Sequence, residues 1–486
     1  MKDKIERSMK LKHNLCIPIG RLSDELITEV LRYGIDTGFE HSFLTEGFPL
    51  FPTYSICTRW RNVAINSPSL WYRIPLPCPQ SLFRLIRDRS RNHSLNVFLL
   101  SDSEYGELNT ALLGESLRQL APRIHKLQVL WSKVATQPDI PTLENFLSVY
   151  IGHKEFSVLR DLDLTDTFDD DPERNPIVLN IPALLKLRFN GAPKIIPRSI
   201  ASLIHLDFKW SRLKISEILD LLSYYPQLKT CSITNPECCG DLEDEDDHDV
   251  VALNQLESLV IDFVHLSEMQ SILAHLTLPV SARLTLGTYL DEPDDILFHN
   301  FIGPYLSKCE ELKISDDETT IIYSMTYQSR GPVSVSHGFP DGPPAEIDAF
   351  PALSLHSINI TLLDIRYSIL PSLGDIIDAF TAWSKIAHIR VCTEELEFER
   401  LLTALEDTPT VVCPLLRTLD CTGTQFSSLR MKQFLDFREK KGVCIQTLKF
   451  TRGFAHYGVD ELLSSATTTI VQSDPVEHQV DDSTET

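Results

Sequence analysis

The 486-residue sequence is short of positive charge: 45 lysine and arginine residues stand against 68 aspartate and glutamate residues, a net charge of −23. A surface dominated by negative charge repels nucleic-acid phosphates and anionic lipids, so we expect neither as a partner. No run of about eighteen apolar residues occurs, which argues against a membrane span. The first residues also lack the apolar core of a secretory signal.

Paired metal and catalytic motifs are also missing. The 11 cysteines include no Cys-x-x-Cys pair, a usage that fits a reducing compartment, cytoplasmic or nuclear. Cys231, Cys238, Cys239 and His248 could be imagined as zinc ligands, but adjacent cysteines make a single tetrahedral site awkward. The chain has no Gly-x-Ser-x-Gly elbow, no phosphate-binding glycine-rich loop and no His-Glu-x-x-His helix. We therefore expect no metal, no cofactor and no catalysis.

One segment keeps an enzymatic alternative open. Asp161-Leu162-Asp163-Leu164-Thr165 has the form Asp-x-Asp-x-Thr and is similar to the signature of phosphatases related to haloacid dehalogenases. That chemistry needs an aspartate nucleophile just beyond a buried strand, a second aspartate as acid/base and a metal held by further carboxylates. The two leucines also fit the repeat pattern described below, which explains the alternation without catalysis.

The stretch from Leu22 to Trp71 is rich in Leu, Ile and Trp. A helix is expected directly after Ser23, a capping residue, with these apolar residues on one face: Leu22, Leu26, Ile27 and Val30. A second helix has apolar residues at the same spacing: Ile56, Trp60, Val63 and Ala64. Because so short a unit cannot bury all of these side chains internally, we expect part of its apolar surface to face a partner.

These residues resemble an F-box, in the divergent form common in mushroom-forming fungi. The family pattern has a Leu-Pro-x-Glu-Leu-Leu start, a Val-Cys-x-x-Trp-Arg middle and a Leu-Trp close. The matching residues are Leu22, Glu25, Leu26 and Ile27 for the start, Ile56, Cys57, Trp60 and Arg61 for the middle, and Leu70 and Trp71 for the close. The sequence departs from the pattern at Ser23, where the family has proline, and in a long insertion at 33–53.

The resemblance implies docking on the Skp-type adaptor of a cullin ubiquitin ligase. The residues expected to contact the adaptor are Leu22, Leu26, Val30, Ile56, Trp60, Leu70 and Trp71. Residues 1–91 contain 14 Lys/Arg and 9 Asp/Glu, a balance of +5 that leaves −28 for the rest of the chain. This basic part would suit an acidic protein, as the adaptor is in the family. The alternative is an ordinary small helical subdomain.

A six-residue pattern, apolar-x-x-apolar-x-apolar, recurs along the rest of the chain. Its central positions lie 19 to 46 residues apart, mostly 25 to 32, a period typical of leucine-rich repeats. The copies include Leu95-x-x-Phe98-x-Leu100, Leu127-x-x-Leu130, Leu159-x-x-Leu162-x-Leu164, Leu184-x-x-Leu187-x-Phe189, Leu256-x-x-Leu259-x-Ile261, Leu355-x-x-Ile358-x-Ile360 and Leu416-x-x-Leu419-x-Cys421. Amphipathic helices are expected between them, for example at 215–224, 396–405 and 429–437.

The predicted fold is α/β: an N-terminal helical F-box followed by a leucine-rich-repeat horseshoe, with a parallel sheet on the concave face and helices on the convex face. An ordinary doubly wound α/β fold is the alternative. The predicted organisation is an N-terminal extension at 1–16, an F-box at 17–76, a solenoid at 77–463 with insertions at 236–250 and 316–350, and a disordered tail at 464–486.

The resemblance and the repeats together predict the substrate-receptor subunit of a Skp–cullin–F-box ubiquitin ligase, without enzymatic activity of its own. A repeat scaffold unconnected to a ligase is the main alternative, and a phosphatase using Asp161 and Asp163 a remote one. Outward side chains of the strands would contact an unknown protein substrate. These are Asp161, Asp163, Lys186, Arg188, His205, Asp207, Arg283, Glu311, Lys313, His388, Arg390 and Lys449.

Overall fold

The chain forms two compact units, Met1–Asp207 (unit 1) and Phe208–Thr486 (unit 2), and each is described by itself. The computed structural model describes residues 21–42, 57–101, 110–132, 142–151, 156–166, 177–179, 181–191, 195–197, 202–209, 213–234, 249–289, 295–317, 320–338, 353, 359–367, 369–406, 411–456 and 468–474. The predicted N-terminal extension, Ile56, Cys238, Cys239, His248 and most of the insertion at 236–250 lie outside these residues.

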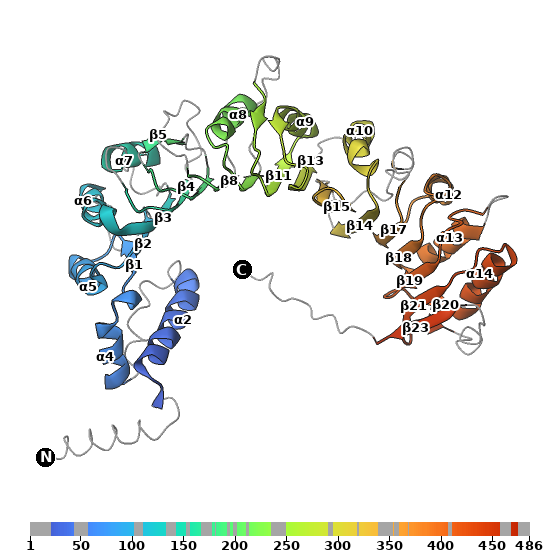
Figure 1. The fold of residues 1–486 in the computed structure, drawn as a ribbon. Coiled ribbons are helices and arrows are strands. Elements are labelled where there is room, and N and C mark those ends of the chain that lie inside the picture. The colour runs from blue at the N-terminus through green and yellow to red at the C-terminus, as the bar shows by residue number, and fades with distance from the viewer. Residues whose placement is uncertain are drawn as a thin grey trace. The chain divides into compact units, whose positions relative to one another are not determined.

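Unit 1 begins with helices, then alternates strands and helices from β1 to β4, and continues with strands (Figure 1). Its elements are α2 (Asp24–Ser42), α4 (Thr58–Asn66), η2 (Pro68–Leu70), β1 (Arg73–Leu76), α5 (Gln80–Ser90), β2 (Leu95–Leu100), α6 (Thr110–Leu120), η3 (Ala121–Arg123), β3 (Ile124–Trp131), α7 (Leu143–Tyr150), β4 (Asp161–Asp166), β5 (Ile177–Leu179), β6 (Lys186–Asn190) and β7 (Ile195–Pro197). β8 (His205–Lys209) includes the boundary with unit 2. β1, β2, β3, β4 and β6 pair in parallel in that order.

The buried side chains of unit 1 form rows that run across the sheet. Strand registers align one row of central positions: Ile74, Val97, Leu127, Leu162 and Leu187. Every residue of this row is at most 1% exposed. Because strand side chains alternate between two faces, the intervening residues point to the opposite, polar face. The predicted stacking of repeats in parallel is therefore confirmed within this unit.

The predicted frame was wrong in the first two repeats. Val97, not Phe98, is the central buried residue of β2, and Leu127, not Leu130, is that of β3. Residues 95–100 are apolar at five of six positions, so alternation alone does not choose a face, and the neighbouring strands decide. Phe98 lies on the outward face, with the Arg73 guanidinium 5.9 Å from its ring centroid.

Unit 2 contains the longer series of strands. Its elements are α8 (Ile215–Ser223), β9 (Thr230–Thr234), β10 (Val251–Ala252), β11 (Ser258–Val264), α9 (Leu266–Ala274), β12 (Leu276–Thr277), β13 (Arg283–Tyr289), α10 (Asp295–Leu306), β14 (Glu311–Asp317), β15 (Thr320–Thr326), β16 (Val333–Gly338), β17 (Leu362–Arg366), α12 (Leu373–Ala382), β18 (His388–Cys392), α13 (Glu395–Glu406), β19 (Thr418–Cys421), β20 (Phe426–Ser427), α14 (Ser428–Lys440), β21 (Thr447–Thr451), β22 (Ala455–His456) and β23 (Thr469–Ser473). The predicted helices at 215–224, 396–405 and 429–437 correspond to α8, α13 and α14. These helices lie on one side of the strands (Figure 1).

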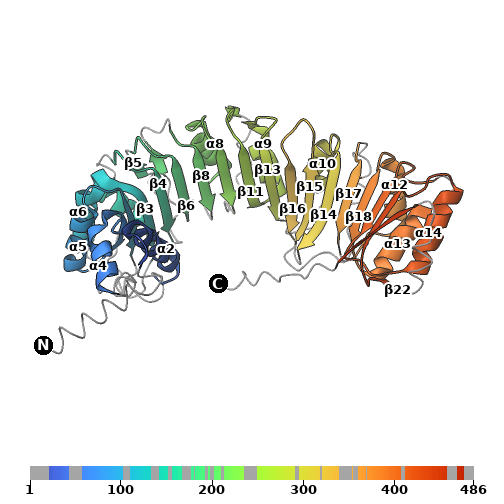
Figure 2. The same cartoon turned by 60° about the horizontal axis from the view of Figure 1, so that its bottom comes forward.

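The main sheet of unit 2 is mostly parallel, with one antiparallel interruption. Its pairing order is β9, β11, β13, β16, β15, β14, β17, β18, β19, β21 and β23. β14, β15 and β16 form an antiparallel meander, so β16 and β15 lie between β13 and β14 (Figure 2). The predicted insertion at 316–350 therefore adds two strands to the sheet. Its alternating Ile321, Tyr323 and Met325 supply the buried face of β15.

Two further predictions differ from the structure in unit 2. β17 has Leu363 and Ile365 as its buried pair, five residues later than the predicted frame of Ile358 and Ile360. The segment 353–365 is rich in Leu and Ile, and the neighbours of β17 select the register. β23 falls within 464–486, predicted as a disordered tail, yet Thr469–Ser473 pairs in parallel with β21. Its β-branched Thr469, Ile470 and Val471 favour a strand.

Candidate protein-interaction surfaces

Helix α2 carries apolar side chains on two different faces. Ser23 caps the helix, since its Oγ accepts from the backbone N–H of Leu26 at 3.3 Å. Ile27, Leu31 and Ile35 are at most 5% exposed and face the rest of the unit. Ile27 therefore does not share a face with Leu26 and Val30 as predicted.

The opposite side of α2 bears an exposed apolar stripe, which we call the α2 stripe: Leu22, Leu26, Val30 and Tyr33. The exposed fractions are 53% for Leu26, 46% for Val30 and 73% for Tyr33, and Leu22 is half-buried. Leu22 lies two residues before the helix, and the spacing of Leu26, Val30 and Tyr33, four and three apart, places them along one helix face. Three of the predicted adaptor contacts, Leu22, Leu26 and Val30, therefore lie together at the surface.

The other described residues predicted to contact the adaptor are interior. Trp60, Leu70 and Trp71 are 4%, 1% and 2% exposed. The indole N–H of Trp71 donates to the carbonyl of Ala64 at 2.7 Å, and the guanidinium of Arg89 lies 4.5 Å from the Trp71 ring centroid. Trp71 also precedes β1 at the first position of a Trp71-x-x-Ile74-x-Leu76 repeat, so it joins the helices to the sheet.

Ion pairs and hydroxyl contacts fix α2 against the following helices. Arg59 on α4 pairs with Asp24 through Nη2 and Oδ1 at 2.8 Å, and its Nη2 also donates to the carbonyl of Leu22 at 2.6 Å. The hydroxyls of Thr28 and Ser67 lie 3.2 Å apart. These contacts hold α2 with its apolar stripe outward.

The outward face of the sheet in unit 1 holds a polar group around Arg188. Its Nη2 lies 3.3 Å from Asp161 Oδ1, and its Nε lies 3.7 Å from Asp163 Oδ2. Gln128 donates to Asp163 Oδ2 at 3.2 Å. Burial pulls the pKa of Arg188 down, but the charges of Asp163, Asp161 and Asp207 outweigh it and raise the pKa above its usual value. The arrangement therefore keeps this guanidinium charged.

The position of Asp161 and Asp163 bears on the phosphatase alternative. Both residues lie inside β4, on its outward face, and both approach Arg188. The nucleophile of that chemistry instead follows the carboxyl end of a strand. Lys186 is exposed on β6, and His205 and Asp207 are half-buried on β8. Asp161 and Asp163 thus form ion pairs with Arg188 on the outward face of the sheet.

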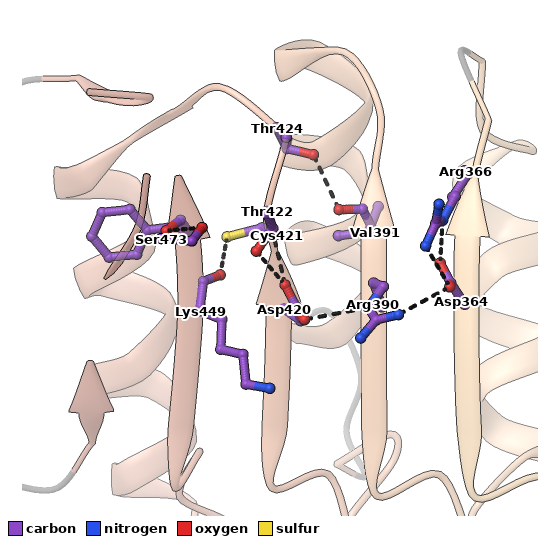
Figure 3. A network of polar contacts seen from close by, with 12 residues as sticks. Asp364, Arg366, Arg390, Val391, Asp420, Cys421, Thr422, Thr424, Lys449 and Ser473 are labelled. Carbon is purple, nitrogen blue, oxygen red and sulfur yellow. Dashed lines mark hydrogen bonds and ion pairs between the residues drawn. The ribbon is translucent and has the colours of Figure 1, made fainter. Parts of the chain in front are cut away.

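The outward face of unit 2 holds a connected charge network on β17, β18 and β19 (Figure 3). Arg366 binds Asp364 with Nε at 3.2 Å from Oδ1 and Nη2 at 3.3 Å from Oδ2. Arg390 reaches both carboxylates, with Nη1 at 3.5 Å from Asp364 Oδ2 and Nε at 3.3 Å from Asp420 Oδ2. Thr422 donates its backbone N–H and hydroxyl to Asp420 Oδ1 at 3.2 and 2.7 Å.

Three charged residues of this network, Asp364, Arg366 and Asp420, were not among the predicted contacts. The misplaced frame at Ile358 hid Asp364 and Arg366, whose correct positions follow from Leu363 and Ile365. Asp420 occupies the fifth position of the Leu416-x-x-Leu419-x-Cys421 copy, so the pattern itself could have found it. The alternation of polar and apolar residues along each strand was the sequence signal that could have identified these outward side chains.

The remaining predicted contacts in unit 2 also face outward. Arg283, Glu311, His388 and Arg390 are exposed, while Lys313 and Lys449 are half-buried. Strand register places Lys313, Asp364, Arg390, Asp420 and Lys449 in one row of alternating charge. Such neighbours of opposite sign stabilise one another across strands.

The cysteines of the described residues are free thiols. Cys231 is 2% exposed in the core of β9, and Cys413 is fully buried, where desolvation raises its pKa to about 12. No cluster of three metal-ligating side chains occurs within the described ranges. Among the described helices, none is both long and apolar enough to cross a bilayer.

Comparison with known proteins gives only a distant structural likeness. No protein-family model matches the chain, and no curated protein matches it. Among solved structures, the chain is similar to an internalin from Listeria monocytogenes at 10% sequence identity, with a TM-score of 0.24, over 83% of this chain and 88% of that chain. The fold therefore rests on the strand registers and helix positions described above.

Proposed function

We propose that the protein is the substrate-receptor subunit of a Skp–cullin–F-box ubiquitin ligase, acting in the cytoplasm or nucleus without catalytic activity of its own. The α2 stripe would dock on the Skp-type adaptor, and outward sheet residues would bind a target protein. The observation that carries the proposal is the exposure of Leu26, Val30 and Tyr33 on one face of a helix whose opposite face is buried.

The energetics of the α2 stripe favour a protein partner. Burying an exposed aliphatic side chain contributes roughly 1.5–3 kcal/mol, so covering the exposed halves of Leu26 and Val30 contributes about 1 kcal/mol each. The basic balance of residues 1–91, +5 against −28 for the remainder, favours an acidic partner at this end. The F-box resemblance names the Skp-type adaptor as that partner.

The proposed mechanism is tethering. A target held by the sheet faces and an adaptor held by α2 are parts of one assembly. The target then meets a ubiquitin-charged enzyme at an effective concentration set by the assembly, without a covalent step on this chain. Exposed polar residues such as Lys186, His388 and Arg390 supply directional contacts for recognition.

A repeat scaffold unconnected to a ligase is the second candidate. It is favoured by the burial of Trp60, Leu70 and Trp71, because a helical cap on the first strand of a solenoid would bury the same residues. The two candidates differ in what they require of the α2 stripe. Only the receptor needs Leu26 and Val30 as a docking surface.

The deciding experiment is co-expression of the full chain with a Skp-type adaptor and quantitative co-purification. We expect the wild-type chain to retain the adaptor. The affinity of the Leu26→Asp/Val30→Asp variant for the adaptor should fall at least about a hundredfold, since two carboxylates would be buried against apolar surface. The matched control is Val149→Asp, which changes another exposed apolar side chain of unit 1, 58% exposed on α7. Thermal unfolding should be nearly unchanged in both variants. Failure of the wild-type chain to retain the adaptor would refute the receptor and leave the scaffold.

A further inference from the structure

The outward face of β17 to β21 is positively charged although the protein as a whole is acidic. Its outward cations are Arg366, Arg390 and Lys449, which we call the Arg–Lys strip. The acidic side chains facing outward on these strands are Asp364 and Asp420. The remaining outward residues there are uncharged or histidine: Leu362, His388, Cys392, Thr418, Thr447 and Thr451.

The two signs of charge lie at different depths. The side chains of Asp364 and Asp420 are only 7% and 11% exposed, whereas those of Arg366 and Arg390 are 48% and 47% exposed. An approaching molecule therefore meets guanidinium groups first and carboxylates only beneath them. Since the nearer charge dominates the potential at short range, this surface attracts anions.

The network also holds the arginines ready for a ligand. Asp364 is clamped by Arg366 from one side and Arg390 from the other, and Thr422 fixes the second carboxylate, Asp420 (Figure 3). Arg366 uses Nε and Nη2 in these contacts, and Arg390 uses Nε and Nη1. Each guanidinium has five N–H donors in a fixed fork, so donors remain on both for a further acceptor. Ordering them in advance lowers the entropy cost of binding.

The spacing of the Arg–Lys strip matches an extended peptide. Arg366 on β17 lies one strand across from Arg390 and two residues further along, which places their Cα atoms about 8 Å apart. Lys449 on β21 lies two strands beyond Arg390 in the same row, about 10 Å away. Carboxylates at alternate positions of an extended peptide lie about 7 Å apart on one side. A peptide crossing the strands can thus present successive acidic side chains to the three cations.

We propose that the Arg–Lys strip is a docking site for a carboxylate-rich peptide segment of a partner protein. Arg366 and Arg390 each donate to one carboxylate through their remaining N–H groups, and Lys449 contacts a third. This inference names the target class of the proposed receptor and rests on it. Its test needs no adaptor, so its failure is distinguishable from failure of adaptor docking.

The test is fluorescence polarisation with the full chain and a labelled peptide of about ten residues in which glutamate alternates with serine. Two comparison peptides are used. In the first, every glutamate is replaced by glutamine. In the second, every glutamate is replaced by glutamine and every serine by phosphoserine. We expect the glutamate peptide to bind more than about tenfold tighter than the glutamine peptide. Its affinity should fall as NaCl rises, because the cations are half-exposed.

Arg366→Gln/Lys449→Gln is the informative variant because Asp364 keeps its contact with Arg390, so no buried carboxylate loses every partner. We expect its affinity for the glutamate peptide to fall at least about tenfold. Lys308→Gln/Lys440→Gln removes the same charge from exposed positions outside the sheet face and should change affinity less than about twofold. Thermal unfolding checks that each variant is folded.

Three results would overturn the proposal: equal binding of the glutamate and glutamine peptides, unchanged affinity in the Arg366→Gln/Lys449→Gln variant while folded, or binding of the phosphoserine peptide alone. The last would assign the strip to phosphate instead of carboxylate. Unfolding of the variant would move the test to Lys449→Gln alone, which breaks no ion pair among the described residues.

Discussion

Replacing Trp71 by Phe tests whether this residue belongs to the interior, as the structure has it, or to a docking surface. Trp71 is 2% exposed between α4 and β1. Its indole N–H donates to the carbonyl of Ala64, near the end of α4. The last carbonyls of a helix have no N–H partner within the helix, so Trp71 supplies the missing donor. Its ring also lies against the Arg89 guanidinium at 4.5 Å.

The cost of Trp71→Phe follows from these two contacts. Leaving a buried carbonyl unsatisfied costs roughly 1–3 kcal/mol, and weakening an arginine–aromatic contact costs about 0.5–1 kcal/mol. Together they predict a loss of about 2 kcal/mol in the local stability of α4 and β1. Because exchange of buried amides follows local opening, this corresponds to about thirtyfold faster hydrogen exchange there.

Hydrogen exchange followed by mass spectrometry measures this effect peptide by peptide. The matched control is Trp383→Phe, a fully buried tryptophan of unit 2, which should accelerate exchange near α12 and leave α4 and β1 unchanged. If exchange at α4 and β1 stayed within about twofold of wild type in Trp71→Phe, the assigned packing of Trp71 would be incorrect.

Two further predictions concern polar groups of unit 2, the fully buried Arg438 and the half-buried Asp262. Arg438 is fully buried and donates to the carbonyls of Val412 at 2.8 Å and Cys413 at 2.9 Å. Arg438→Met would leave both buried carbonyls without these donors, at roughly 1–3 kcal/mol each, so urea unfolding should show a loss of about 2–5 kcal/mol. Lys440→Met on the same helix should cost little. Burial raises the pKa of Asp262, so its charged form opposes folding at neutral pH, and stability gains as pH falls through the folded-state pKa. The unfolding free energy of wild type minus that of Asp262→Asn should therefore rise as pH is lowered from about 7, and a flat difference would contradict the assignment.

The repeat pattern predicted the class of fold because the alternation of apolar and polar residues within a strand depends only on residues close together in the sequence. Leu162, Leu164, Leu187 and Phe189 alternate with polar residues, and alternation fixes which side chains face the core once a strand forms. In the same way, Ser23 and the acidic residues after it predicted the start of α2, and the spacing of Ile218, Leu219 and Leu222 predicted α8.

Sequence alone was insufficient where the apolar residues of a segment fit more than one alternating frame. Residues 95–100 and 353–365 admit more than one frame, and only pairing with neighbouring strands selected Val97 and Leu363. The inserted meander of β15 and β16 is a related case, since β16 joins the sheet by pairing with β13, a strand distant from it in sequence.

The surfaces show the same division between sequence and tertiary structure. The sequence by itself determined an apolar N-terminal stretch, a run of strand–helix repeats and their outward polar positions. Only the tertiary structure decided that Leu26 and Val30 stay exposed while Trp60 and Trp71 are buried, and that Arg366 and Arg390 cover Asp364. Burial and ion pairing depend on side chains from separate elements meeting in space, which no local pattern specifies.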